Sequence, residues 1–239
     1  MTQQSSQRRF RPRFWPTIIA VPSLIILVGL GTWQLDRMAW KADLLATIEE
    51  RLEAPAVPLP ATLDDPAAWN YRRVTVAGQF QTDHVFRLIG RVHDDRVGEE
   101  LLVPLVRTNP SAQGQIVLVD RGWVPAGWNG ELPAGEDEVS GLMRLPAAPG
   151  WFQPENQPET NQWFTIDLDR ISEILGNARV FPMVLYEDAG PEGQVPIGGQ
   201  LRVTIPNDHL SYALTWYGLA VVLLVIYILF HIRRPEENQ

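Results

Sequence analysis

A histidine, two aromatic rings and two small residues recur at helical spacing near the C-terminus. At about 100° per residue they share one face of a helix: His209, Tyr212, Ala213, Trp216 and Ala220. Imidazole can coordinate a metal, and flat rings can stack on a flat ligand. The positive end of the helix dipole disfavours imidazolium and keeps His209 neutral, whereas Asp208 beside it has the opposite effect. The pattern fits either a ligand site or an aromatic belt at a membrane surface.

A second set of possible metal ligands lies in two short acidic segments, Asp83-His84 and His93-Asp94-Asp95. Their spacing matches no zinc motif, and such segments usually form solvated hairpin tips. A membrane-bound hydrolase or metal enzyme at His84 and His93 is one alternative for the function. However, the serines lie in no nucleophile motif, and the chain has no phosphate-binding loop and no cysteine. The sequence therefore predicts a protein that is not an enzyme.

Two uncharged apolar runs, Phe14 to Leu35 and Leu210 to Phe230, are long enough to cross the roughly 30 Å hydrocarbon layer of a membrane. The first run is longer than the apolar part of a signal peptide, and no small-residue cleavage site follows it. We therefore predict an uncleaved helix there. Four residues return to one side of this helix: Pro22, Gly29, Trp33 and Trp40. We expect Pro22 and Gly29 to allow close approach of the second helix.

Arginines flank both runs on the side of the chain termini: Arg8, Arg9, Arg11, Arg13, Arg233 and Arg234. Under the positive-inside tendency, both termini are cytoplasmic and residues 36–208 lie on the far side of the membrane. Trp33 and Gln34 then end the first helix at the surface where His209 and Tyr212 begin the second, so these helix ends can meet. We expect a two-pass protein of the bacterial inner (plasma) membrane with a periplasmic central domain, or alternatively of the mitochondrial inner membrane.

Between the apolar runs, short β-branched segments alternate with glycine and proline turns. The segments that predict strands are 72–80, 85–91, 101–108, 115–123, 139–145, 181–187 and 201–205, and residues 167–175 predict one helix. We therefore expect a membrane-anchored α+β protein, with two transmembrane helices flanking a mainly antiparallel β-barrel or sandwich domain with one packed helix. A net charge of −8 argues against nucleic acid as a partner.

These patterns predict the following organisation. A basic cytoplasmic tail covers residues 1–13, transmembrane helix 1 covers 14–35, an amphipathic helix and linker cover 36–60, the extramembrane mainly-β domain covers 61–206, transmembrane helix 2 covers 207–231, and a second cytoplasmic tail covers 232–239.

Six sequence blocks, in order along the chain, resemble those of the Surfeit-locus-one family, called Shy in yeast. The blocks are Gly31–Lys41, Tyr71–Phe80, Asp120–Pro125, Gln153–Trp163, Pro196–Thr204 and Asn207–Gly218. Each block alone is weakly specific, but six in family order are a specific match. The segment from Arg91 to Glu100 departs from the expected pattern, which leaves the role of that loop open.

The resemblance implies a cytochrome c oxidase assembly factor that acts as a haem a chaperone in respiratory chain biogenesis. It would deliver haem a to oxidase subunit I or stabilise an early subunit I intermediate. Its partner would be subunit I, with haem A synthase and other assembly factors as further candidates. The family's second-helix histidine corresponds to His209, which would ligate the haem iron. The other residues expected at the bound haem are Trp33, Gln34, Arg37, Tyr212 and Trp216.

The haem carboxylates would also lie near Arg121 and Arg202 if the domain folds down over the helices. The alternative function is a membrane-tethered scaffold that binds assembly partners through its acidic β-domain without ligating haem, with His209 merely interfacial.

Overall fold

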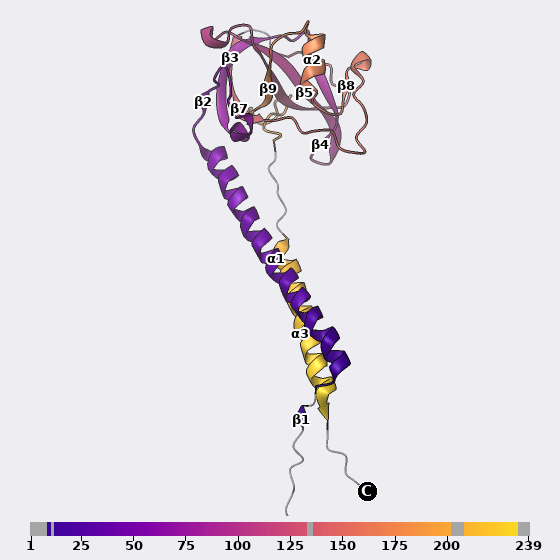
Figure 1. Ribbon diagram of the computed structural model, residues 1–239. Helices are drawn as coiled ribbons and strands as arrows, with labels where there is room; N and C mark the ends of the chain where they lie inside the picture. Colours follow the sequence, from indigo (N-terminus) through magenta and orange to yellow (C-terminus); the bar gives the residue numbers. More distant parts are fainter. Residues whose placement is uncertain (1–8, 11, 133–135, 202–207, 234–239) are drawn as a thin grey trace, which may run out of the picture. The chain divides into compact units, whose positions relative to one another are not determined.

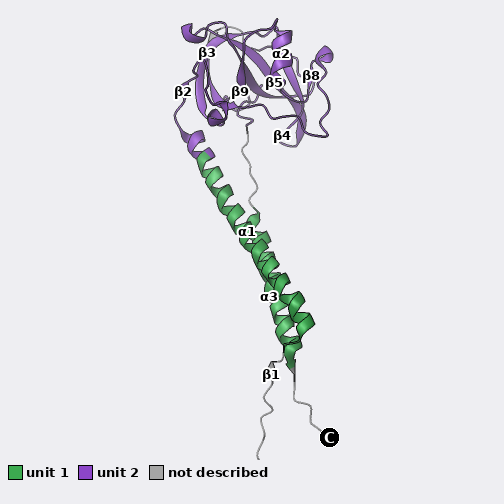
Figure 2. Ribbon diagram, in the orientation of Figure 1, with its two compact units in different colours: residues 1–47, 204–239 green, residues 48–203 purple. Residues whose placement is uncertain are grey.

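The computed structural model describes residues 9–10, 12–132, 136–201 and 208–233 of the chain (Figure 1). It divides into two compact units, residues 1–47 with 204–239 and residues 48–203 (Figure 2). The first unit contains most of one long helix and all of another, and the second contains a β-sheet and a short helix. The predicted membrane-anchored α+β architecture is therefore confirmed.

The helical unit is built on α1 (Phe14–Glu53) and α3 (His209–His231), and both helices are long and apolar enough to cross a membrane. The predicted membrane helix and the amphipathic segment after it form one continuous helix of 40 residues. No proline interrupts α1 between Pro22 and Pro55, so the backbone ladder has no break there.

The segment just before α1 and the segment just after α3 pair in a short antiparallel ladder between β1 (Arg9–Phe10) and β10 (Ile232–Arg233). The two segments that leave the helices are therefore neighbours.

The two helices pack through a small-residue face that differs from the predicted one. Gly31 is buried, and a Cβ atom on it would lie 2.8 Å from Cε1 of Tyr217. By contrast, nothing lies within 4 Å of a Cβ on Gly29, so the prediction that Gly29 allows close approach is wrong. Two residues correspond to about 200° of helix rotation, which places Gly29 on the opposite side from Gly31. Pro22, Trp33 and Trp40 are exposed with Gly29.

On α3, the predicted small residues do face the partner helix. Ala213 and Ala220 are buried, whereas Leu210, Leu214 and Val221 are exposed in the way a lipid-facing side requires. The alanines allow close backbone approach, which is the usual basis of helix association in membranes.

The second unit, residues 48–203, is called the outer unit from here on, and it contains a sheet in which five strands close into a ring. The strands are β2 (Val57–Pro58), β3 (Arg73–Phe80), β4 (Phe86–His93), β5 (Arg96–Arg107), β6 (Ile116–Pro125), β7 (Glu136–Arg144), β8 (Gln162–Trp163) and β9 (Val180–Glu187). The order β3-β7-β9-β6-β5 returns to β3 through a β3–β5 pairing. Most pairings are antiparallel, but β6–β9, β2–β3 and β4–β8 are parallel.

Alternate residues of these strands supply two hydrophobic cores. Val117, Val119 and Phe181 belong to the core of one sheet face, and Leu118 and Val184 belong to the core of the other. The second core is covered by α2 (Leu168–Ile174), whose start is capped by Asp167 through a 3.0 Å bond from the backbone N–H of Arg170. Three short 3-10 helices complete the unit: Pro66–Trp69, Pro110–Ala112 and Pro158–Thr160. Of the strand predicted over 201–205, residues 202–205 lie outside the described residues.

Candidate functional site

The imidazole of His209 is held by an amide from the other helix. Its Nδ1 lies 2.7 Å from Oε1 of Gln34. Because an amide oxygen only accepts hydrogen bonds, Nδ1 carries the proton, and in the neutral form of the ring the lone pair is on Nε2. Within the described part of the chain, Nε2 has no hydrogen-bond partner. The arrangement leaves one ring nitrogen fixed and the other available as a ligand.

Local structure explains how these side chains meet. His209 is the first residue of α3 after the N-cap position at Asp208, and it is half-buried. Gln34 lies three residues, or nearly one turn, after the buried Gly31 on α1, so it faces the same partner. The predicted meeting of Gln34 with the start of the second helix is therefore confirmed, but Gln34 lies within α1 and not at its end, because α1 continues to Glu53. Asn207, the other possible cap, lies outside the described residues.

The other residues predicted for the site differ in how far they are exposed. Trp216 is half-buried, but Tyr212 is 58% exposed and Trp33 is 52% exposed. The guanidinium of Arg37 lies 4.5 Å from the ring centroid of Trp40 and is exposed. The structure thus pairs His209 with Gln34 and leaves two aromatic rings and one cation on the surface of the helical unit.

Tyr217 is a structural partner that sequence reasoning missed. Its ring packs on Gly31, and its hydroxyl lies 3.1 Å from Oγ1 of Thr32. The signal was present in the spacing, because residues 209, 213 and 217 follow one another at four-residue intervals and share a helix face. Its neighbour Trp216 was chosen because it lies seven residues after His209 and so falls on the same face by spacing.

The far end of the helix pair has its own polar contacts. Oγ1 of Thr17 lies 2.7 Å from the hydroxyl of Tyr227, and Nδ1 of the buried His231 donates to the carbonyl oxygen of Tyr227 at 2.6 Å. The 22 residues between His209 and His231 correspond to about 33 Å of helix, so the two histidines of one chain cannot ligate one ion.

Arg121, one of the two arginines expected near the haem carboxylates, is held by other side chains of the outer unit. Nε of Arg121 lies 2.6 Å from Oε2 of Glu187, its side chain is 10% exposed, and its guanidinium stacks on Phe80 at 4.3 Å. These contacts fit a structural role. Arg202 lies outside the described residues.

The two outer histidines make separate contacts. His93 stacks on Trp123 with ring centroids 5.3 Å apart, and its Nδ1 lies 3.0 Å from Oε1 of Gln200. His84 has only an exposed contact, 3.6 Å from Asp83. In the residues that the structure describes, no three His, Asp or Glu side chains are grouped to hold a metal.

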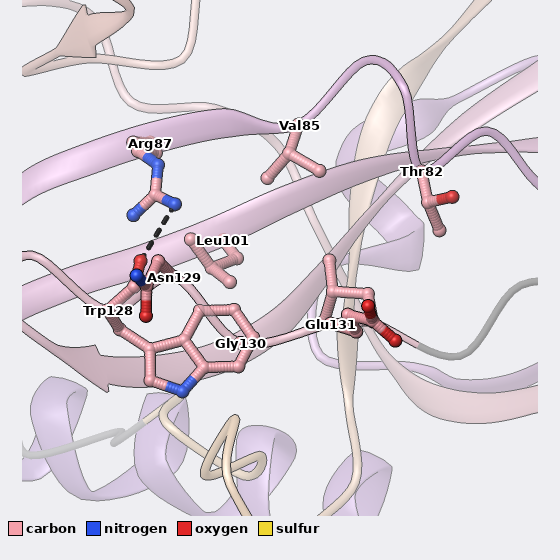
Figure 3. A pocket seen from close by; sticks show the side chains of 9 residues that line it. Thr82, Val85, Arg87, Leu101, Trp128, Asn129, Gly130 and Glu131 are labelled. Carbon is pink, nitrogen blue, oxygen red and sulfur yellow. Dashed lines mark hydrogen bonds between the residues drawn. The ribbon is translucent and has the colours of Figure 1, made fainter.

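A hollow of about 500 Å³ opens on the outer unit between β4, β5 and the loop at residues 128–132 (Figure 3). Its cation, Arg87, donates to Oε2 of Glu99 at 2.7 Å and to the carbonyl oxygen of Trp128 at 2.9 Å. The guanidinium therefore anchors the loop to the sheet.

The helices and the outer domain define a membrane-anchored protein with a histidine-bearing helix pair and a small β-barrel domain inserted between the helices. Residues 21–221 match the SURF1 family, and the chain belongs to that family. Members of this family are known as cytochrome c oxidase assembly factors.

Similar proteins carry the family's name. The chain is 36% identical to human Surfeit locus protein 1, covering 80% of this chain and 69% of the human protein. It is 34% identical to the mouse Surfeit locus protein 1, covering 86% and 72% of the respective chains. It is 30% identical to a SURF1-like protein of Monosiga brevicollis, covering 95% and 89%.

Proposed function

We propose that this protein binds haem a through His209 and delivers it to, or stabilises it in, subunit I of cytochrome c oxidase. The observation that carries the proposal is the bond between Nδ1 of His209 and Gln34, 2.7 Å long. Histidines that ligate metals usually donate their other ring N–H to an oxygen acceptor, which fixes the tautomer and the ring orientation. The His209 ring meets this requirement.

The surroundings also suit a haem. When bound, haem a supplies an iron that accepts an axial nitrogen, together with a flat apolar ring and two carboxylates. Nε2 of His209 would be the axial ligand, the exposed ring of Tyr212 and the half-buried Trp216 provide surfaces for stacking, and Arg37 provides a cation for a carboxylate. The residues of this chain thus hold and orient the cofactor, and the proposed role requires no catalysis.

The helix pair and the basic ends of the chain support the location that we propose. The β1–β10 ladder places the segments outside the two helices side by side, which supports a topology with both termini on one side of the membrane. With the positive-inside tendency, this side is the cytoplasm of a bacterium, and the β-domain is periplasmic. The mitochondrial inner membrane is the alternative location. Haem A synthase is a candidate donor and subunit I the candidate acceptor.

The test is to express the protein together with haem A biosynthesis and to record the absorption spectrum of the purified protein. The wild type should retain haem a, and His209→Ala should lose it or shift its bands. His84→Ala is the matched control, because it removes an exposed histidine of the outer unit and should leave the spectrum unchanged. An unchanged spectrum in His209→Ala would refute ligation by this residue.

A second candidate function, a scaffold for assembly partners, is favoured by one feature of the outer unit. Trp151 and Phe152 are 98% and 99% exposed, and side chains of this type dominate the binding energy of protein interfaces. Replacing both by serine should leave haem binding intact. If oxidase assembly then fails although haem is retained, the scaffold role is supported, and normal assembly would count against it.

A further inference from the structure

A row of ionisable side chains crosses the outer unit where the second hydrophobic core ends. Asp120 on β6 pairs in register with Tyr186 on β9, and Glu100 on β5 pairs with Leu88, a member of that core. Arg144 lies two residues after Leu142, the partner of Tyr186, and therefore on the same sheet face. Strands from across the sheet thus place charged groups together at one end of a core.

A cavity of about 190 Å³ lies beside this row. Its polar lining includes Arg91, Arg144 and Tyr186, and residues 145–148 and 164–166 with Gln153 complete the wall. At about 30 Å³ per water molecule, the cavity has room for about six waters. It therefore suits a small ion or a short side chain and is too small for a nucleotide.

The two arginines of this cavity have donors to spare. Arg144 lies 5.8 Å from the ring centroid of Tyr71 and makes no ion pair or hydrogen bond within the described residues. Nε of Arg91 lies 3.1 Å from Oε2 of Glu100. The two terminal nitrogens of Arg91 have no hydrogen bond to any residue that the structure describes. Guanidinium groups with unused donors on a concave surface are the groups that bind oxyanions in a forked geometry.

Burial opposes ionisation of the two acids beside these cations, Asp120 and Glu100. Asp120 is 1% exposed, and burial, reinforced by the nearby Glu100, raises its pKa well above the ordinary value. Its Oδ1 accepts from the backbone N–H of Gly122 at 2.9 Å, while Oδ2 has no partner among the described residues. Burial also raises the pKa of Glu100, with Arg91 and Arg144 acting in the opposite direction. Both acids therefore ionise less readily than exposed carboxyl groups, which weakens the negative charge that they set against Arg91 and Arg144.

We propose that this cavity binds a small oxyanion, a phosphate or a carboxylate group, between Arg91 and Arg144. The site lies wholly within the outer unit and does not depend on haem binding. It also gives a role to the segment that departs from the family pattern, because Arg91 and Glu100 are the two ends of that segment.

The test uses the full chain in detergent, titrated calorimetrically in a chloride buffer with inorganic phosphate and, separately, with succinate. Either anion should bind saturably at one site, and the tighter of the two identifies the source of the oxyanion. Arg144→Gln should weaken binding at least tenfold, because a charge-assisted pair is lost. Arg170→Gln is the matched control, because Arg170 is an exposed arginine of the same unit, paired with Glu173 at 2.6 Å.

Absence of saturable binding with both anions, or equal affinity in wild type and Arg144→Gln, would overturn the proposal. Circular dichroism shows whether Arg144→Gln folds. If it does not fold, Arg144→Lys keeps the positive charge and should still bind, more weakly because the forked geometry is lost. Undiminished affinity in Arg144→Lys would then overturn the forked site. The haem spectrum of either folded variant should remain that of the wild type.

Discussion

Gln34→Leu is the sharpest test of the histidine site. Leucine has a similar size to glutamine but no acceptor, so the change removes the oxygen 2.7 Å from Nδ1 of His209 and leaves the imidazole itself in place. The ring then loses the bond that fixes its tautomer and its orientation. If His209 binds haem through Nε2, affinity must fall although the ligand is still present.

The size of the effect can be worked out from this single bond. A neutral hydrogen bond contributes a net ~1 kcal/mol, which alone corresponds to a factor of about 5. Loss of the partner that orients a ligating histidine typically costs about 10–100-fold in metal affinity, because ring orientation and basicity change together. We therefore expect haem to bind at least about tenfold more weakly to Gln34→Leu.

The assay is an absorbance titration of haem-free protein with haem in detergent. Thr32→Val is the matched control, because it removes another interhelix contact, 3.1 Å from the hydroxyl of Tyr217, without touching the histidine. This control should bind within about twofold of wild type. Equal affinity in Gln34→Leu and wild type would show that the bond to Gln34 does not prepare a ligand and would refute the reasoning.

Three further predictions concern packing and charge. Gly31→Val should loosen the helix pair by about 1–3 kcal/mol through a clash with Tyr217, whereas Gly29→Val, with open space around it, should not; thermal unfolding in detergent compares them. Asp120 has a raised pKa when folded, so its contribution to stability falls as pH rises above its ordinary value of 3.8; Asp120→Asn should flatten the dependence of unfolding temperature on pH above that value. Arg107→Leu leaves buried carbonyl acceptors unpaired and should lower the unfolding temperature of the outer unit by at least about 3 °C, measured by circular dichroism.

The architecture was predictable because its signals are local. Uncharged runs as long as residues 14–35 and 210–230 form few structures other than membrane helices. Strands can be predicted from β-branched residues bounded by turns. The meeting of Gln34 with His209 followed from topology, since two helices of opposite direction place these residues at one surface. The specific 2.7 Å bond could not be predicted, because it depends on how each helix is rotated about its own axis.

Features that depend on pairing between distant segments escaped prediction. Choosing Gly29 over Gly31 was a question of helix rotation, which the composition of α1 does not settle because both glycines lie in the same uncharged run. The row of Arg91, Glu100 and Asp120 is invisible in the sequence, because its members come from three strands whose register is set by the whole sheet.

The polar contacts between the helices lock their register. Thr17 with Tyr227, Thr32 with Tyr217 and Gln34 with His209 form three rungs along the pair. Sliding one helix by a turn, about 5.4 Å, would break all three at once in a solvent that offers no replacement partners. If the haem site proposed at His209 is correct, such a slide is a costly route for release of the cofactor, whereas rotation of the imidazole side chain alone would disturb only one of the three contacts.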